Sequence, residues 1–243
     1  MADWSRGTPT PGRRPAVEIE GLARRFGRRW ALRGVSFRIE PGEAAALVGR
    51  NGSGKTTLLR VVATLLRPTR GRVRVAGRDV VGEATAVREH VGMMGHAPGL
   101  YDDLTAAENL RFAVRMMGRA VEESRIAEAL GAVGLAAESH ERVRGFSAGM
   151  RRRLVLARLR LQRPDVLLLD EPYASFDAEG VELINAFVRE TVERGGAALV
   201  ATHDLARGAG VLERVLVLDA GLIVDEAPPV AERAAAGREA VAP

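Results

Sequence analysis

The chain contains no cysteine, so it can form no disulfide framework, no thiolate metal site and no cysteine nucleophile. Aromatic residues make up only 4% of its 243 residues. No apolar run is long enough to span a bilayer, and the first residues lack the apolar core of a secretory signal. From these absences we expect a protein that stays in the cytoplasm.

Lysine is almost absent as well, because Lys55 is the only one and every other fixed cation is an arginine. It lies in the run Gly49-Arg50-Asn51-Gly52-Ser53-Gly54-Lys55-Thr56, which fits the phosphate-binding pattern G-x-x-x-x-G-K-[ST]. A compact ammonium suits a crowded loop around a triphosphate better than a planar guanidinium does. Lys55 is therefore predicted to neutralise the β- and γ-phosphates of a nucleotide.

The net charge of +5 and the pI of about 10.7 would suit binding to nucleic acid or to an anionic membrane surface. The arginines are scattered along the chain, however, and aromatic residues are few. A bias toward arginine in place of lysine raises the pI without making a basic patch. We therefore expect no nucleic-acid partner.

Hydrophobic patterning divides the chain into three parts. Residues 1–15 are polar and rich in proline and glycine, which predicts a disordered leader. Residues 16–227 carry strand and helix patterns typical of one α/β domain, and its residues from about 89 to 162 have helical patterns that favour a nested helical subdomain. Residues 228–243 are alanine-rich and are expected to form a flexible tail.

The local context of the glycine-rich run supports a phosphate loop. A strand is predicted at 44–48, directly before the run, and a helix from about Lys55 to Leu66 after it. The glycines allow backbone N–H groups to point at phosphate oxygens, and the helix N-terminus adds partial positive charge. Thr56 is placed to ligate Mg²⁺. Thr57 either contributes to the nucleotide site or is simply a residue of the first helical turn.

Two adjacent carboxylates, Asp170 and Glu171, follow the apolar strand predicted at 166–169. Open α/β sheets bind ligands at the carboxyl ends of their strands. Asp170 is placed to hold Mg²⁺ through water, and Glu171 to polarise an attacking water molecule. Alone, the pair would fit an ordinary solvated turn at a strand end.

A capped helix start is predicted at Phe146-Ser147-Ala148-Gly149-Met150, with Ser147 as the N-cap. Small residues leave its backbone N–H groups accessible, and such a helix start can bind a γ-phosphate. Alone, this segment indicates only a capped helix.

In this order, the motifs resemble the nucleotide-binding subunit of an ABC transporter over about residues 17–225. The resemblance implies a P-loop NTPase core of the ABC-ATPase type, with a nested helical subdomain and an N-terminal antiparallel β element. Ser147, Ala148, Gly149 and Met150 match the family signature with substitutions, and would contact the ATP of a second copy. Asp177 matches the loop that works across the dimer, and His203 the switch histidine at the γ-phosphate. Phe26 takes the place of the aromatic that stacks on adenine, or is merely an aromatic at a strand end.

The chain departs from the family pattern at His96, where the family normally has a glutamine that ligates magnesium and water. The stretch Gly-His-x-Pro-Gly at 95–99 resembles the ATP-binding subunit of the haem exporter of cytochrome c maturation. The Ser-Ala-Gly signature followed by arginines at 151–153 resembles that subfamily too. His96 either ligates metal as a neutral imidazole, a weaker ligand for a hard ion than an amide oxygen, or only packs the turn before Pro98.

The resemblance implies an ATP-hydrolysing subunit, peripheral on the inner face of the cell membrane, that uses ATP and Mg²⁺. It implies a homodimer that closes around ATP and drives a separate membrane permease, docked near residues 93–112, with haem as the expected cargo. One alternative is an exporter ATPase for another cargo, such as a drug or a lipid. A second is an ABC-type ATPase that acts on nucleic acid or ribosomes, although the chain has neither a long coiled-coil insertion nor a tandem module.

Overall fold

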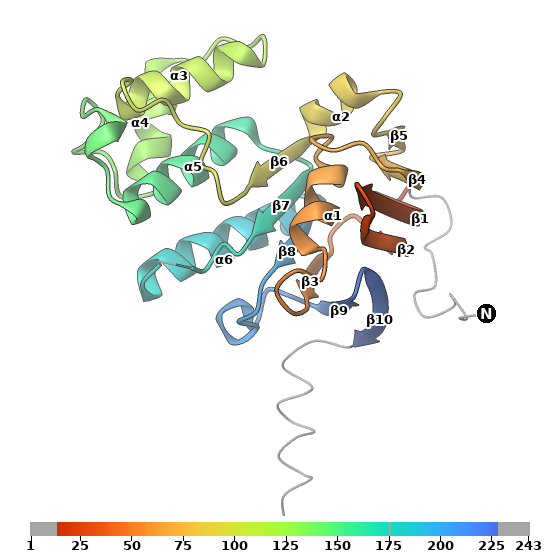
Figure 1. The fold of residues 1–243 in the computed structure, drawn as a ribbon. Helices are drawn as coiled ribbons and strands as arrows, with labels where there is room; N and C mark the ends of the chain where they lie inside the picture. The colour runs from red at the N-terminus through yellow and green to blue at the C-terminus, as the bar shows by residue number, and fades with distance from the viewer. Residues whose placement is uncertain (1–13, 175, 228–243) are drawn as a thin grey trace, which may run out of the picture.

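The computed structural model describes residues 14–174 and 176–227 (Figure 1). Most of the expected leader and all of the expected tail lie outside these residues, so both stay predictions. Within the described part, the chain folds around a six-stranded sheet and a four-stranded sheet, as expected for an α/β core with an antiparallel β element.

The six-stranded sheet has the order β10-β9-β3-β8-β7-β6 and is parallel except for its last strand in the chain, β10. Its strands are β3 (Ala44–Val48), β6 (Val91–Met94), β7 (Val166–Asp170), β8 (Ala197–Ala201), β9 (Arg214–Asp219) and β10 (Leu222–Ala227). Successive side chains point to opposite faces, so Leu167 and Leu169 join one buried cluster and Leu168 joins the other. Such burial on both faces explains the continuous apolar runs of these strands.

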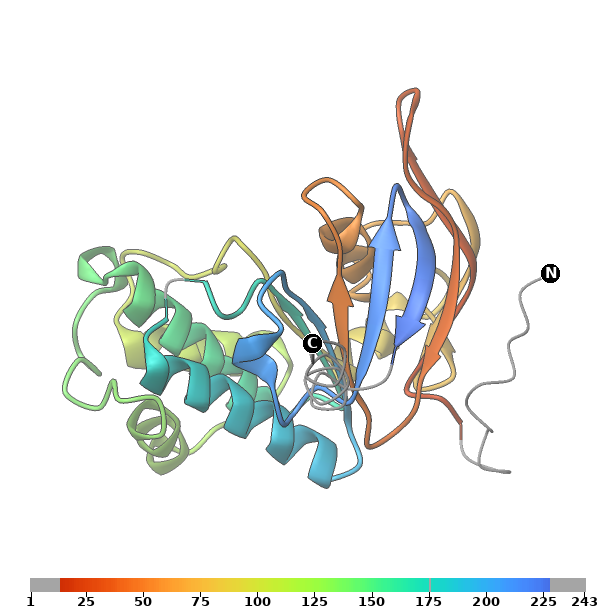
Figure 2. The same cartoon turned by 90° about the horizontal axis from the view of Figure 1, so that it is seen from below.

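One face of this sheet is covered by helix α1 (Lys55–Val62) and by the four-stranded antiparallel sheet, which has the order β2-β1-β4-β5. The strands of that sheet are β1 (Val17–Phe26), β2 (Arg29–Ile39), β4 (Arg70–Val75) and β5 (Arg78–Asp79). The hairpin formed by β1 and β2 extends beyond the rest of the molecule at its turn (Figure 2). Phe26 stands at that end of the hairpin.

The other face of the main sheet packs against a helical layer (Figure 1). That layer contains α3 (Ala106–Met116), α4 (Glu123–Gly131), α5 (Ala148–Gln162) and α6 (Ala178–Glu193). The expected start of the helical subdomain at about residue 89 needs correction. α2 (Ala84–His90) ends there, and residues 91–94 form β6, which pairs with β7 as an edge strand of the main sheet.

Helix α1 is shorter than expected, because it ends at Val62 and not at Leu66. Thr64 adopts a left-handed backbone with φ 62°, which a continuing right-handed helix cannot include. The amides of Leu65 and Leu66 both donate to the carbonyl of Arg60 and close the helix end. The helix therefore ends several residues before Pro68.

Parallel pairing brings the carboxyl ends of four strands to one edge of the main sheet. Leu47 pairs with Ala201 in β8, and Ala201 pairs in turn with Asp170 in β7. Met94 of β6 pairs with Leu169 of β7. The segments that follow β3, β6, β7 and β8 therefore emerge side by side, which is where open α/β sheets place their sites.

Candidate active site

A cleft of about 600 Å³ opens at this edge of the sheet. It is lined by residues from the phosphate loop and α1, from the ends of β1 and β7, from β2 and from the segment after β6: Phe26, Arg29, Ala31, Asn51, Gly52, Gly54, Lys55, Thr56, Thr57, His96, Asp170 and Glu171. Most of the residues that the sequence singled out for nucleotide binding thus share one cleft.

The phosphate loop has a conformation that side chains at two of its glycines would not allow. Gly49 has φ 154°, and a Cβ atom there would lie 2.1 Å from the carbonyl oxygen of Leu218. Gly54 has φ 116°, and its Cβ would lie 2.6 Å from the carbonyl oxygen of Ala31. The glycines are therefore required by close packing of the loop against its neighbours as well as by its turns.

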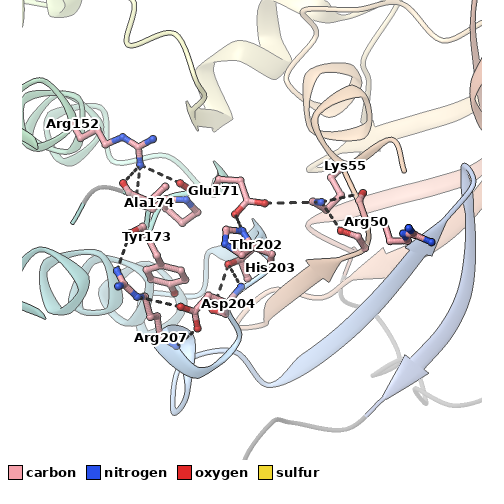
Figure 3. Close-up of polar contacts among 12 residues, drawn as sticks. Arg50, Lys55, Arg152, Glu171, Tyr173, Ala174, Thr202, His203, Asp204 and Arg207 are labelled. Carbon is pink, nitrogen blue, oxygen red and sulfur yellow. Dashed lines mark hydrogen bonds and ion pairs between the residues drawn. The ribbon is translucent and has the colours of Figure 1, made fainter. Parts of the chain in front are cut away.

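Lys55 is buried, with only 7% of its surface exposed. Its Nζ donates hydrogen bonds to the carbonyl of Gly49 at 2.7 Å and of Arg50 at 3.5 Å, and lies 3.9 Å from Oε1 of Glu171 (Figure 3). The charge is thus held inside the curve of the loop and next to one carboxylate. An ammonium with three donors fits this point, and a phosphate oxygen that entered the loop would meet it directly.

A hydroxyl oxygen of Thr56 and a carboxylate oxygen of Asp170 lie next to each other in the cleft. The Thr56 hydroxyl donates to Oδ2 of Asp170 at 2.8 Å, and the Asp170 carboxylate is 2% exposed. Among the described residues, no group of three or more His, Asp or Glu side chains could hold a metal alone. The two oxygen atoms of Thr56 and Asp170 suit Mg²⁺, which proteins usually bind through one or two side-chain oxygens together with water and substrate phosphates.

Glu171 stands directly after β7, and its carboxylate is shared between two partners. Oε2 lies 2.7 Å from Nδ1 of His203, which follows β8, while Oε1 faces Lys55 (Figure 3). The Glu171 backbone is left-handed, with φ 50°. A non-glycine residue in this region is uncommon, and such local strain is concentrated at functional sites.

Phe26 and His96 line the same cleft as the phosphate loop. The Phe26 ring is 46% exposed, and the guanidinium of Arg24 lies 4.6 Å from its centre. An exposed ring beside the phosphate loop is available to stack on a flat ligand. His96 is also exposed, and it belongs to the segment that follows β6.

The signature residues lie outside this cleft, at the N-terminus of α5. The Ser147 hydroxyl accepts a hydrogen bond from the Met150 amide at 3.2 Å, which confirms the predicted N-cap. Ser147 and Ala148 are exposed, and Gly149 and Met150 are half-buried. Asp177 is likewise exposed and caps α6 by accepting from the Gly180 amide. Contact of these residues with a nucleotide or a second copy stays a prediction.

Sequence reasoning missed some residues of the site. Arg29 and Ala31 line the cleft because β2 runs beside the phosphate loop, and only the closeness of Arg29 to Phe26 in the sequence hinted at this. Arg152 and Arg207 bind backbone carbonyls in the loop that carries Glu171. Arg152 had been noted only as part of an arginine run.

The fold and the cleft together define a P-loop ATPase. The family model described as ABC transporter matches residues 32–174, which is more than half of the chain. The chain therefore belongs to the ABC transporter family, and its nucleotide-binding features make it an ATP-hydrolysing subunit of that family. In the described residues, no helix is both long and apolar enough to cross a membrane.

Three named relatives match most of the chain. A cytochrome c biogenesis ATP-binding export protein, CcmA, of Cupriavidus necator is 39% identical over 85% of this chain and 89% of its own length. The CcmA of Xanthomonas campestris is 43% identical over 76% of this chain and 86% of its own length. The daunorubicin resistance ATP-binding protein DrrA3 of Streptomyces coeruleorubidus is 38% identical over 87% of this chain and 67% of its own length.

Solved structures agree with the fold. An ATP-binding cassette in a dimeric post-hydrolysis state with ADP and phosphate is 25% identical and has a TM-score of 0.79, over 87% of this chain and 98% of that one. An ATP-binding subunit of an ABC transporter has a TM-score of 0.82 at 24% identity, over 93% and 95% of the two chains, and this second likeness supports the fold alone.

Proposed function

We propose that this chain powers export through a separate membrane permease, with haem for cytochrome c maturation as the cargo. The observation that carries the proposal is His96 in the ATP cleft, where the Gly-His-x-Pro-Gly stretch resembles the haem-exporter subfamily. The CcmA relatives, which are named for cytochrome c biogenesis and export, support the same assignment.

In this proposal, the residues of the cleft have separate roles in binding and hydrolysing ATP. The phosphate loop from Gly49 to Thr56 binds the phosphates through its backbone, and Lys55 binds the γ-phosphate after releasing the Gly49 carbonyl. Thr56 and Asp170 would hold Mg²⁺, which neutralises phosphate charge when bound. Phe26 stacks on adenine at the mouth of the cleft.

Glu171 acts as the general base in this proposal. It accepts a proton from the attacking water, and His203 keeps its carboxylate aimed into the cleft and contacts the γ-phosphate. These residues contribute mainly positioning and charge stabilisation, which is the usual source of catalysis in phosphoryl transfer.

The family works as dimers of ATP-binding subunits with a membrane permease, and a dimer explains why Ser147 to Met150 lie outside the cleft. In the proposed dimer, the signature end of α5 in one copy covers the ATP bound by the other copy, and Asp177 contacts the partner across the interface. The exposed helix start offers backbone N–H groups of the kind that bind phosphate.

The permease is proposed to dock near residues 93–112, on the surface formed by the residues that come after His96 in the chain. Tyr101 and Phe112 are 54% and 37% exposed there, and their ring centres lie 4.7 Å apart in an edge-to-face arrangement. Met116, which lies on α3 together with Phe112, is 71% exposed. Exposed apolar side chains close together mark interaction surfaces. Docking at this surface would place the subunit on the inner face of the cell membrane.

A second candidate is export of a drug. The DrrA3 relative, which is named for daunorubicin resistance, covers slightly more of the chain than the CcmA relatives do. Because the cargo is bound by the permease, the residues of the ATP cleft that bind phosphate are compatible with both candidates. Haem export is favoured by the sequence around His96 and Ser147 and by the CcmA relatives.

The test begins with the membranes of the native host. A tagged Glu171→Gln chain is incubated there with ATP and Mg²⁺, and proteins that copurify with it are identified by mass spectrometry, with Lys55→Ala as the control for ATP-dependent capture. The gene for the chain is then deleted. Loss of c-type cytochromes supports haem export; intact cytochromes with new drug sensitivity would establish the second candidate instead.

A further inference from the structure

The main-chain carbonyls of the loop that joins β7 to α6 accept several hydrogen bonds from two arginine side chains, Arg152 and Arg207. The described residues of this loop are 171–174, 176 and 177. Nη1 of Arg152 donates to the carbonyls of Glu171 at 3.1 Å, of Pro172 at 3.3 Å and of Ala174 (Figure 3). Arg152 belongs to the second turn of α5 and follows shortly after the signature residues, 147–150.

Arg207 binds the same loop from the other side. Its Nη1 donates to the carbonyls of Tyr173 and Phe176, both at 3.0 Å, and its Nε lies 3.2 Å from Oδ2 of Asp204 (Figure 3). The Tyr173 hydroxyl donates to Asn185 in α6. Burial, with a smaller effect of Asp204, raises the pKa of the Tyr173 phenol, so it remains a neutral donor. The loop is therefore fixed from the segment after His203 as well.

Arg152 differs from the arginines on either side of it. Arg151 pairs with Asp102, and Arg153 lies within ion-pair distance of Asp177 and Glu179. Among the described residues, no carboxylate lies within 4.0 Å of the Arg152 guanidinium, whose recorded partners are the three carbonyls. Hydrogen bonds from a charged donor are stronger than neutral ones, so the bonds from Nη1 of Arg152 hold these carbonyls more strongly than a neutral donor would.

These bonds bear directly on the backbone of Glu171. Its left-handed φ of 50° costs free energy that the surroundings must supply. The Glu171 amide donates to the carbonyl of Ala201 at 2.8 Å, and its carbonyl accepts from Arg152. Both peptide groups are thus held, and the side chain is directed toward Lys55 and His203 as a result.

We infer that Arg152 is a positioning residue for ATP hydrolysis, because it fixes the Glu171 backbone from the helix that carries the signature. The inference deepens the proposed function, since it rests on Glu171 being the general base. It also links two parts of the chain: a shift of the signature end of α5 moves the guanidinium that holds the Glu171 carbonyl.

The test compares Arg152→Met and Arg152→Lys with wild type. Methionine keeps an apolar stem of similar length but removes every donor, so kcat should fall by about 10- to 100-fold, the cost of a small misplacement of a catalytic group. The KM for ATP and the Kd for a fluorescent ATP analogue should change less than about twofold, because the phosphate loop is untouched. Lysine should restore much of the kcat, since one ammonium also presents its donors at a single point.

Arg160→Met is the matched control. Arg160 lies on the same helix, and its side chain pairs with Glu190 of α6. This variant should keep wild-type kcat, and thermal unfolding of all variants shows whether each is folded. Equal loss of kcat in Arg152→Met and Arg160→Met, or a loss confined to ATP affinity, would overturn the inference.

A double-mutant cycle separates the inference from the function on which it rests. If Arg152 acts through Glu171, adding Arg152→Met to Glu171→Gln should lower single-turnover hydrolysis by less than about threefold further. If Glu171→Gln is slow but the two losses multiply, the inference alone is overturned. If Glu171→Gln turns over like wild type, the proposed role of Glu171 fails, and the inference fails with it.

Discussion

Oε2 of Glu171 lies 2.7 Å from Nδ1 of His203, although the two residues follow different strands, β7 and β8. The His203 side chain is 72% exposed, whereas that of Glu171 is 16% exposed. The histidine therefore reaches in from solvent to orient a largely buried carboxylate. A second group, the Lys55 ammonium, faces the other oxygen of Glu171 at 3.9 Å.

We predict that His203→Ala lowers kcat by about 100-fold, since it removes both the group that orients Glu171 and the proposed donor to the γ-phosphate. ATP binding should weaken far less, because the phosphate loop remains. His203→Gln should lose less activity than His203→Ala, because the amide can still donate to the carboxylate. A steady-state ATPase assay with a parallel binding titration checks this, and an unchanged kcat in His203→Ala would contradict the role.

Lys55→Arg is predicted to be almost as inactive as Lys55→Ala, although it conserves the charge. Nζ of Lys55 donates to the Gly49 carbonyl at 2.7 Å in a position that is 7% exposed, where we expect a larger planar guanidinium to fit poorly. Both variants should bind ATP weakly and hydrolyse it at less than about 1% of the wild-type rate. Turnover near the wild-type level in Lys55→Arg would show that charge alone matters at this position.

His96 is the residue at which this chain departs from the family pattern, and it lies in the cleft. If it stands in for the family glutamine, His96→Gln should retain most ATPase activity, because an amide oxygen can ligate the same metal or water. His96→Ala should lose permease-stimulated activity more than basal activity, because the loop joins the cleft to the proposed docking surface.

The measurement is ATPase activity with and without the permease, for wild type, His96→Gln and His96→Ala. If His96→Ala behaves as wild type in both assays, His96 only packs the turn before Pro98.

A stability prediction concerns the start of α3. The Thr105 hydroxyl accepts from the Glu108 amide at 3.2 Å, and the Glu108 carboxylate accepts from the Thr105 amide at 2.8 Å. Removing this capping box by Thr105→Ala should destabilise the protein by about 1 kcal/mol. Ser124→Ala, on the exposed face of α4, is the control and should be near neutral. Equal denaturant midpoints for Thr105→Ala and wild type would contradict the prediction.

The same cap has a pH dependence with a defined sign. The hydrogen bond from the Thr105 amide lowers the pKa of Glu108 in the folded protein. The folded state therefore favours the charged form of Glu108, and the resulting contribution to stability is fully present above the pKa of the unfolded state. The stability difference between wild type and Glu108→Gln should shrink as the pH falls through the folded pKa.

The sequence predicted the elements whose patterns are strong and local. The apolar run at 44–48 gave β3 with its observed bounds, because both of its faces are buried. By contrast, β10 was not predicted, since it is an edge strand that carries Asp225 and Glu226 and has little apolar alternation. The end of α1 was placed too late because the left-handed turn at Thr64 has no signal in residue type.

The candidate site divides in the same way. Lys55 and Thr56 were predictable because they close a glycine-rich loop between a recognisable strand and a helix. Asp170 and Glu171 were predictable because they lie at the end of a recognisable strand, and strand ends converge in a parallel sheet. The contacts of Arg152 were not, since they are made to main-chain carbonyls whose direction depends on the backbone of Glu171. Residue types give no information about that direction.

Glu171→Gln tests the central claim, that this chain hydrolyses ATP with Glu171 as the base in a site completed by a second copy. Glutamine keeps the size and hydrogen bonding of the side chain but cannot accept the proton, so the variant should bind ATP and hydrolyse it very slowly. In the proposed dimer opening follows hydrolysis, so the variant should accumulate with bound ATP.

The measurement is sizing chromatography with light scattering in ATP and Mg²⁺, with wild type and Lys55→Ala as controls. The account predicts that Glu171→Gln elutes at twice the 26.0 kDa chain mass only when ATP is present, and that Lys55→Ala stays monomeric. A Glu171→Gln variant that stays monomeric in ATP and turns over at the wild-type rate would contradict the account.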